Sequence, residues 1–153
     1  MIYKVKLVSQ TNAILLWITM VLVVSVSAGM FLPPGGLQNK GLSILAVSVI
    51  TIVTYVLWQL FVTGQSVWTV DENGIKIVWT KQFTLSGSTD LFLKWSEIEA
   101  ISRGFDPYYD KLKIRLISGD TIKYFHHNLT TKDDFEKLIE ALHQTLKEKS
   151  YSE

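Results

Sequence analysis

Two long apolar stretches dominate the first part of the chain. Residues 12–32 and 42–63 contain no charged side chain and consist mainly of Ile, Leu, Val and aromatic residues. A helix of roughly 20 residues spans the ~30 Å hydrocarbon core of a bilayer. The segment between them, residues 33–41, holds two Pro and three Gly. Because Pro and Gly end helices and form turns, the pattern predicts an antiparallel transmembrane hairpin.

Two other interpretations of these stretches are open. They could be core helices of a soluble protein, but a domain of this size would not cover both helices on all sides. Residues 1–28 could also form a cleaved signal peptide, because Lys4 and Lys6 precede the apolar run and small residues end it. The run continues to Leu32 and a second one follows at once, which favours a hairpin that is retained.

The sequence after the hairpin alternates between apolar and polar residues, which is typical of half-buried strands. A first hairpin is predicted around residues 71–74, where Asn73-Gly74 tolerates positive φ. Residues 82–85 and 91–95 are expected to form a second pair, and residues 97–103 a further strand.

The clearest strands are predicted at residues 111–117 and 121–127. A loop of three residues, 118–120, would place Leu116 opposite Ile122 and Arg115 opposite Lys123. One face of the pair would then be basic. Its cations are Lys111, Lys113, Arg115 and Lys123.

Both ends of the chain carry patterned segments as well. Residues 2–8 alternate, and we expect them to add a strand to the sheet or to lie at the membrane interface. Residues 135–146 have apolar side chains at helical spacing, which predicts an amphipathic helix capped by Thr131 with Asp134 three positions later. The expected fold is α+β. It has two domains, a transmembrane hairpin at 1–63 and a curled antiparallel sheet or barrel with one C-terminal helix at 64–153.

Charge is distributed unevenly between these parts. The first 63 residues carry +3 and the remainder carries −2, so the soluble part is not basic and no nucleic-acid partner is expected. Lysines near the helix ends modestly favour both termini in the cytosol.

Candidate chemistry is sparse. There is no Cys, and no phosphate loop or catalytic signature is present in the sequence. His126 and His127 point to opposite faces of a strand, which makes them a poor metal-binding pair. Asp133 and Asp134 suit the first turn of the C-terminal helix. We therefore expect no metal, no cofactor and no enzymatic activity.

The order of elements adds a family resemblance. An early strand pair around residues 71–75, the stretch Trp95-Ser96-Glu97-Ile98, a basic hairpin and a final amphipathic helix follow one another. This order resembles the bacterial pleckstrin-homology-like (PH-like) domains attached to a transmembrane hairpin. The resemblance implies a seven-stranded barrel closed by a C-terminal helix, in a small bacterial inner-membrane protein. It implies no reaction, because this fold hosts lipid binders, peptide binders and scaffolds.

Three functions compete on this basis. The first is a non-enzymatic scaffold or binding module that recruits a protein partner. The second is a sensor of anionic membrane lipids that uses the basic face, with the aromatic residues Tyr108 and Tyr109 as a further contact for membrane or partner. The third is an accessory subunit of a membrane enzyme or transporter, packed through small residues of the first span such as Ser25 and Ser27.

Overall fold

The computed structural model describes residues 1–31, 40–85, 88–105, 109–127 and 133–150. Seven strands form one antiparallel sheet, and three α-helices and two short helical turns accompany it. The strands are β1 (Ile2–Val8), β2 (Thr63–Val70), β3 (Gly74–Lys81), β4 (Leu91–Lys94), β5 (Ile98–Phe105), β6 (Tyr109–Leu116) and β7 (Thr121–His127). The helices are α1 (Gln10–Phe31), α2 (Lys40–Leu57) and α3 (Phe135–Ser150), with a π-turn η1 (Trp58–Val62) and a 3-10 turn η2 (Trp95–Glu97).

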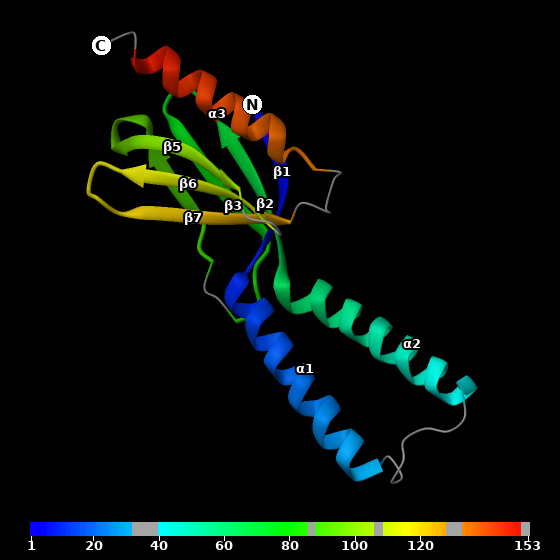
Figure 1. The fold of residues 1–153 in the computed structure, drawn as a ribbon. Helices are drawn as coiled ribbons and strands as arrows, with labels where there is room; N and C mark the ends of the chain where they lie inside the picture. Colours follow the sequence, from blue (N-terminus) through cyan, green and yellow to red (C-terminus); the bar gives the residue numbers. More distant parts are fainter. Residues whose placement is uncertain (32–39, 86–87, 106–108, 128–132, 151–153) are drawn as a thin grey trace.

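Two apolar helices project from one end of this sheet (Figure 1). Residues 10–27 and 41–62 are long and apolar enough to cross a membrane, and almost none of their residues is buried. The two helices run in opposite directions and diverge as they leave the sheet (Figure 1). The predicted turn at 33–41 lies largely outside the described residues.

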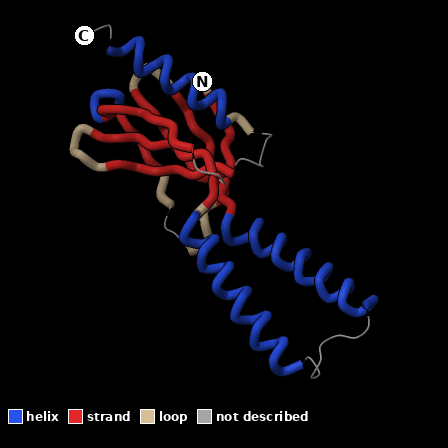
Figure 2. Tube along the Cα trace, viewed as in Figure 1, coloured by secondary structure: helices blue, strands red, loops and turns tan. Residues whose placement is uncertain are grey.

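The first strand is central to the sheet, whose order is β4-β3-β2-β1-β7-β6-β5. Every residue of β1 pairs with β2, from Ile2 with Thr69 to Val8 with Thr63. The expectation that residues 2–8 add a strand is therefore confirmed, and the sheet extends across the division predicted between residues 63 and 64. Both helices are inserted between two neighbouring strands (Figure 2).

The core lies between the bent sheet and α3. Because α3 packs against the central strands β1 and β2 and also against the edge strand β5, the β5 end of the sheet must curve toward this helix. Trp68 and Phe135 are its largest fully buried side chains. The predicted helical stripe is confirmed, since Phe135, Leu138 and Leu142 are all buried. The predicted cap Thr131 lies outside the described residues.

Two predicted turns are present, but the conformation of the first and the position of the second differ from those expected. At residues 71–74 the Asp71 carboxylate accepts the amides of Asn73 and Gly74 at 2.9 and 3.0 Å, without positive φ at either residue. The second turn begins earlier than predicted, because Leu116 bonds to Asp120 and leaves Ile117–Gly119 as its loop, with Gly119 at φ +92°. Glycine adopts this conformation at no steric cost, which fixes the turn.

One predicted strand pairing is wrong. Residues 91–94 do form β4, but they pair with the first half of β3, Gly74–Ile77, and residues 82–85 are not a strand. β3 supplies a longer and more apolar edge than residues 82–85, so it is the better partner. The prediction at 97–103 is confirmed as β5.

Candidate binding site

The predicted basic residues do share the outer face of β6 and β7. Lys111, Lys113 and Arg115 alternate with the buried Leu112 and Ile114. The register differs from the prediction by two residues because of the earlier turn: Lys113, not Arg115, lies opposite Lys123. Two cations directly opposite each other on neighbouring strands repel, so this pair is electrostatically unfavourable.

The remaining members of the basic face have partners within the protein. The Lys111 amine lies 4.9 Å from the centre of the Phe125 ring, and the Arg115 guanidinium lies 3.7 Å from the Glu99 carboxylate. These exposed contacts are weak. β6 begins near the apolar helices and leads away from them to the turn at residues 117–119, and β7 returns from that turn, so only one end of the face is near the helices (Figure 1).

Tyr109 lies at that near end and is packed, not free. It joins Trp58 and Leu16 around the buried residues Val8, Ala13 and Val62, where the helices meet the sheet. The ring of His127 lies edge-on to both Tyr109 and Trp58, at 5.7 and 6.1 Å. Burial, and then the charge of His126, lower the pKa of His127 below its ordinary 6.5. Tyr108 lies outside the described residues.

His126 has a structural role on the opposite face of β7. Its ring stacks on Phe135 at 4.2 Å, and its Nε2 lies 3.0 Å from the Asp133 carboxylate. Asp133 also accepts the amides of Lys6 at 2.8 Å and Phe135 at 3.2 Å. Burial alone would raise the pKa of Asp133, but the bonds from His126 and these amides outweigh it and hold the pKa below 3.8. In the part of the chain that the structure describes, no group of acidic, His or Cys side chains could hold a metal ion.

Side chains from β3, the following loop and α1 donate hydrogen bonds to carbonyl groups at the end of the second helix. A π-turn leaves carbonyl groups without their usual helical partners. The Gln59 carbonyl accepts a hydrogen bond from the Lys81 amine, and the Leu60 carbonyl accepts one from the Thr84 hydroxyl at 3.2 Å. The Phe61 carbonyl accepts a hydrogen bond from the side-chain amide of Asn12 at 2.8 Å. The loop after β3 and the start of α1 are thereby fixed to the end of α2.

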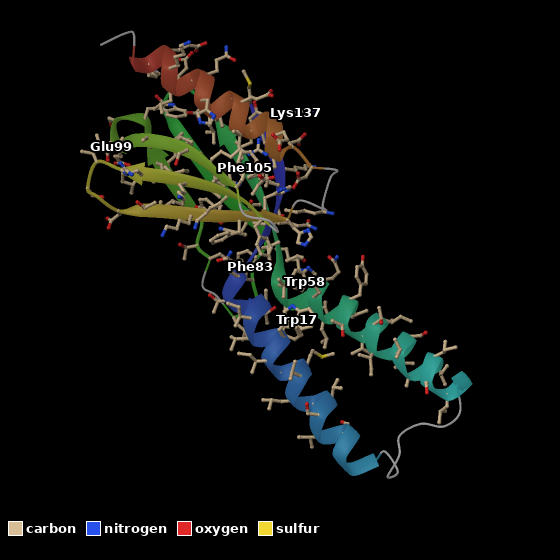
Figure 3. All side chains as sticks on the ribbon, in the orientation of Figure 1. Trp17, Trp58, Phe83, Glu99, Phe105 and Lys137 are labelled. Carbon is tan, nitrogen blue, oxygen red and sulfur yellow. The ribbon has the colours of Figure 1, made fainter. Side chains whose placement is uncertain are left out.

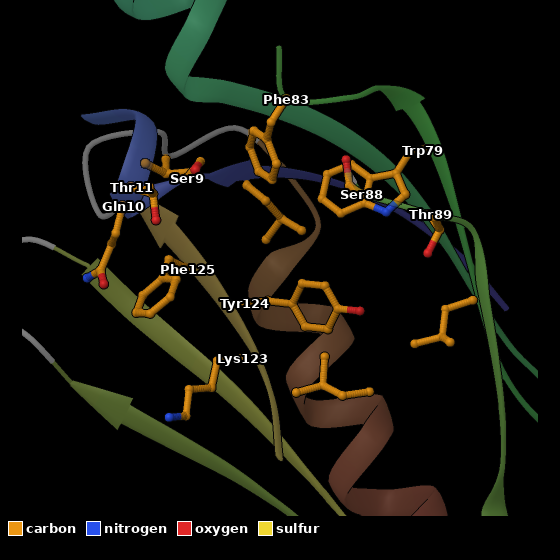
Figure 4. Close-up of a pocket in the computed structure, with 14 residues that line it drawn as sticks. Ser9, Gln10, Thr11, Trp79, Phe83, Ser88, Thr89, Lys123, Tyr124 and Phe125 are labelled. Atoms are coloured by element: carbon orange, nitrogen blue, oxygen red, sulfur yellow. The ribbon is translucent and has the colours of Figure 1, made fainter. Parts of the chain in front are cut away.

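A pocket of about 410 Å³ opens beside this junction, and we call it the junction pocket (Figure 4). Residues from β1, the start of α1, β3, β4, the loop between them and β7 line it. Its apolar lining consists of Leu7, Val8, Trp79, Phe83, Leu91, Ile122, Tyr124 and Phe125. Its polar lining consists of Ser9, Gln10, Thr11, Ser88, Thr89 and Lys123.

The pocket exists because two strands separate. β1 and β7 pair only at Val8 and Phe125, and the rest of β7 diverges from β1. Phe83 lies between the sheet and the start of α1, where it closes one side of the gap (Figure 3). Its ring packs on Trp79 with centres 5.1 Å apart.

Polar groups around the pocket can donate hydrogen bonds. Of the described residues that line it, Lys123 is the only charged one. The Ser88 hydroxyl is buried and has no hydrogen-bond partner among the described residues. Burial raises the pKa of Tyr124 to about 12, so its hydroxyl stays protonated at neutral pH. Gln10 and Thr11 are the first two residues of α1, where helix amides have no partner within the helix.

A second, apolar groove of about 590 Å³ lies between α1 and α2. Trp17 and Trp58 flank its end nearest the sheet (Figure 3), and Ser25 lines it farther along. The hydroxyls of Thr51 and Thr54 also line it but bond to carbonyls of their own helix, each at 2.8 Å. The groove therefore offers a largely apolar surface.

Sequence reasoning missed the junction pocket, because residues distant in the chain form it. One signal was present: the polar run Ser9-Gln10-Thr11 separates an alternating segment from an apolar one. Its partners at 79–91 and 122–125 could not be assigned to it without the strand order.

The comparisons with known proteins identify no relative. No protein-family model matches the chain, and no curated protein or solved structure matches it either. The resemblance to PH-like domains stays a prediction.

Proposed function

We propose that the chain is a membrane-anchored, non-enzymatic binding module. The two apolar helices cross a bilayer, and a PH-like domain on the cytosolic side presents its surface and the junction pocket to partners. The supporting observation is the insertion of both helices between two paired strands. Only Ser9 separates β1 from α1, and the π-turn leads directly into β2. A sheet held so closely keeps one orientation relative to the helices.

Binding fits the described residues better than catalysis does. The junction pocket combines an apolar lining with a few polar groups, which is the usual character of small-molecule sites. Its volume lies within the ~300–1,000 Å³ range of such sites. Among the described residues that line it, there is neither a carboxylate nor a histidine that could act as a general base.

Membrane insertion and topology can be tested with single cysteines, because the chain has none of its own. Ser118→Cys lies in the exposed turn after β6, and Gln38→Cys lies between the two helices in sequence. In spheroplasts, an impermeant maleimide should label Gln38→Cys and reach Ser118→Cys only after permeabilisation. Release of the protein by alkaline carbonate, or labelling of Ser118→Cys without permeabilisation, would contradict the proposal.

A protein partner is the second part of the proposal. Cross-linking in intact cells followed by affinity purification of the full chain should recover the same partner repeatedly. Purification of the chain alone in replicate experiments would count against a scaffold role.

The direct opposition of Lys113 and Lys123 supports a second candidate, in which the basic face contacts anionic lipid headgroups. An anion between the two amines would relieve their repulsion. Charge reversal at Lys113 and Arg115 should then weaken attachment of the reconstituted protein's sheet to anionic vesicles, measured by protection from a soluble protease. Equal protection of the variant and the original protein would reject this candidate.

A further inference from the structure

We propose that the junction pocket binds a single-chain anionic amphiphile, with the apolar chain among the aromatic side chains and the anionic group at the rim near Lys123. The inference rests on the proposed function, because it adds a ligand class to the binding module. A fatty acid and a lysophospholipid share this chemistry, and the experiment below separates them.

The lining of the pocket is suited to an apolar chain. The rings of Trp79, Phe83 and Tyr124 lie around the same space (Figure 4), and Leu91 and Ile122 also line the pocket. Trp79 and Phe83 are only partly buried, so their rings remain available to a ligand. Burying apolar surface contributes ~25 cal/mol per Å², which favours an alkyl chain over a free polar headgroup.

The rim of the pocket favours an anionic group. Among the described residues of the lining, Lys123 is the single charged one, and the exposed end of its side chain lies outside the ring of aromatic groups (Figure 4). The start of the 22-residue helix α1 adds the positive end of a helix dipole through Gln10 and Thr11. No carboxylate of the described residues lines the pocket to oppose an anion.

Two further observations support a ligand in the pocket. The Ser88 hydroxyl is buried without a partner among the described residues, and a ligand acceptor would satisfy it. Lys123 also lies opposite Lys113, so an anion near Lys123 would offset part of their repulsion. The lining therefore offers one hydroxyl donor and one exposed cation to an anionic ligand.

The position of the pocket fits an amphiphile that arrives from a bilayer. Its rim includes the first turn of α1, whose apolar stretch begins at the same point. Phe83 forms one wall, and the neighbouring Thr84 bonds to the carbonyl of Leu60 in η1. A chain leaving the interface would meet the pocket without crossing the sheet.

The test uses the full chain purified in a mild detergent, with binding read by native mass spectrometry and by titration of tryptophan fluorescence. The probes are laurate, lauroyl lysophosphatidic acid, neutral monolaurin and inorganic phosphate. At least one of the two anionic lauroyl probes should bind saturably at one site per chain. Monolaurin and phosphate should bind at least tenfold more weakly.

The variants Lys123→Gln and Lys113→Gln form a matched pair, because the two lysines lie opposite each other and only Lys123 lines the pocket. Lys123→Gln should weaken binding of the anionic probe about tenfold. Lys113→Gln should weaken it clearly less, because Lys113 does not line the pocket and acts on the anion only from a distance. Leu91→Trp, which fills the pocket, should abolish binding while the unfolding temperature shows that the protein is folded.

Three results would overturn the proposal. One is equal weakening by the two lysine variants, another is binding of monolaurin or phosphate as tight as that of the anionic lauroyl probes, and the third is undiminished binding to folded Leu91→Trp. Binding in detergent does not depend on whether the helices cross a bilayer. Failure of this test is therefore distinguishable from failure of the carbonate and cysteine-labelling tests of membrane insertion.

Discussion

At the scale of single residues, the buried pair of His126 and Asp133 shows how an acidic helix start can serve the sheet. Only Val8 of β1 pairs with β7, so the other edge amides of β1 need partners. The carboxylates of Asp133 and Asp134 accept the amides of Lys6 and Lys4 at 2.8 and 3.1 Å. These two residues therefore fasten the start of α3 to the central strand.

We expect Asp133→Ala to destabilise the protein strongly. It leaves His126 and the Lys6 amide without their acceptor, and breaking a buried pair costs about 3–5 kcal/mol. Asp134→Ala is the matched control, because Asp134 is more exposed and should cost about 1 kcal/mol. Thermal unfolding in detergent measures both. Equal losses of stability for the two variants would show that the buried pair of His126 and Asp133 contributes no more than the more exposed Asp134.

The lowered pKa of Asp133 predicts a pH dependence. Its pKa is lower in the folded protein than its ordinary 3.8, so the unfolded chain binds the proton more readily. The contribution of Asp133 is full above the ordinary pKa and is lost as the pH falls through the lower folded value. The unfolding temperature of the original protein should therefore approach that of Asp133→Asn between pH 5 and pH 2. A gap that stays constant over this range would contradict the assignment.

At the scale of elements, close backbone contact decides where β4 lies. An added Cβ at Gly74 would collide with the backbone of Leu93, so the tight approach of β3 and β4 requires glycine there. At Gly104 the nearest atoms would be 3.8 Å away, which is ordinary contact. Gly74 is therefore required by a close backbone contact, whereas Gly104 is not.

Gly74→Ala should accordingly destabilise the sheet by about 1–3 kcal/mol, the usual effect of forcing an atom into a packed site. Gly104→Ala should change stability by less than about 0.5 kcal/mol, as surface substitutions usually do. Chemical unfolding of the two variants, followed by tryptophan fluorescence, makes the comparison. A larger loss of stability for Gly104→Ala than for Gly74→Ala would contradict the assignment of the tight contact to β3 and β4.

At the scale of the whole molecule, the helix pair is an insertion within the sheet. Val8 and Thr63 pair directly, although 54 residues separate them in the chain. The sheet consequently depends on residues that precede the helices. The core contains Tyr3, Val5 and Leu7 from β1 as well as side chains from the later strands.

This arrangement predicts that residues 64–153 will not fold alone, because they lack the central strand. By contrast, residues 1–8 joined to residues 63–153 by Asn-Gly should fold, since Val8 and Thr63 already occupy neighbouring positions. Cooperative unfolding by circular dichroism distinguishes the two fragments. A stable fragment 64–153 would show that β1 is dispensable.

Several elements of this fold could be predicted because their signals are local. The apolar runs, the stripe at Phe135, Leu138 and Leu142, and the alternation of β6 all follow from spacing along a single element. The register of β6 and β7 was wrong because the loop depends on the conformation of Gly119. The partner of β4 was wrong because residues 82–85 are not a strand, and β3 offers a longer and more apolar edge.

The candidate site also has a part that the sequence predicts and a part that it does not. Strand alternation, which is a local property, places four cations on one face: Lys111, Lys113, Arg115 and Lys123. The junction pocket could not be predicted in this way, because it depends on where β1 separates from β7 and on which loop lies beside the gap. Its residues come from three separate parts of the chain, residues 7–11, 79–91 and 122–125.

The sequence by itself determined the two apolar helices, the alternation of residues 2–8 and the amphipathic helix at the end. Each depends on periodicity within one segment, which local sterics and burial dictate. Only the tertiary structure decided that β1 lies at the centre, that the helices are inserted beside it and that a pocket opens where β1 and β7 separate. These features depend on which distant segments pair, and the free energy of pairing is set by the whole core and by no single segment.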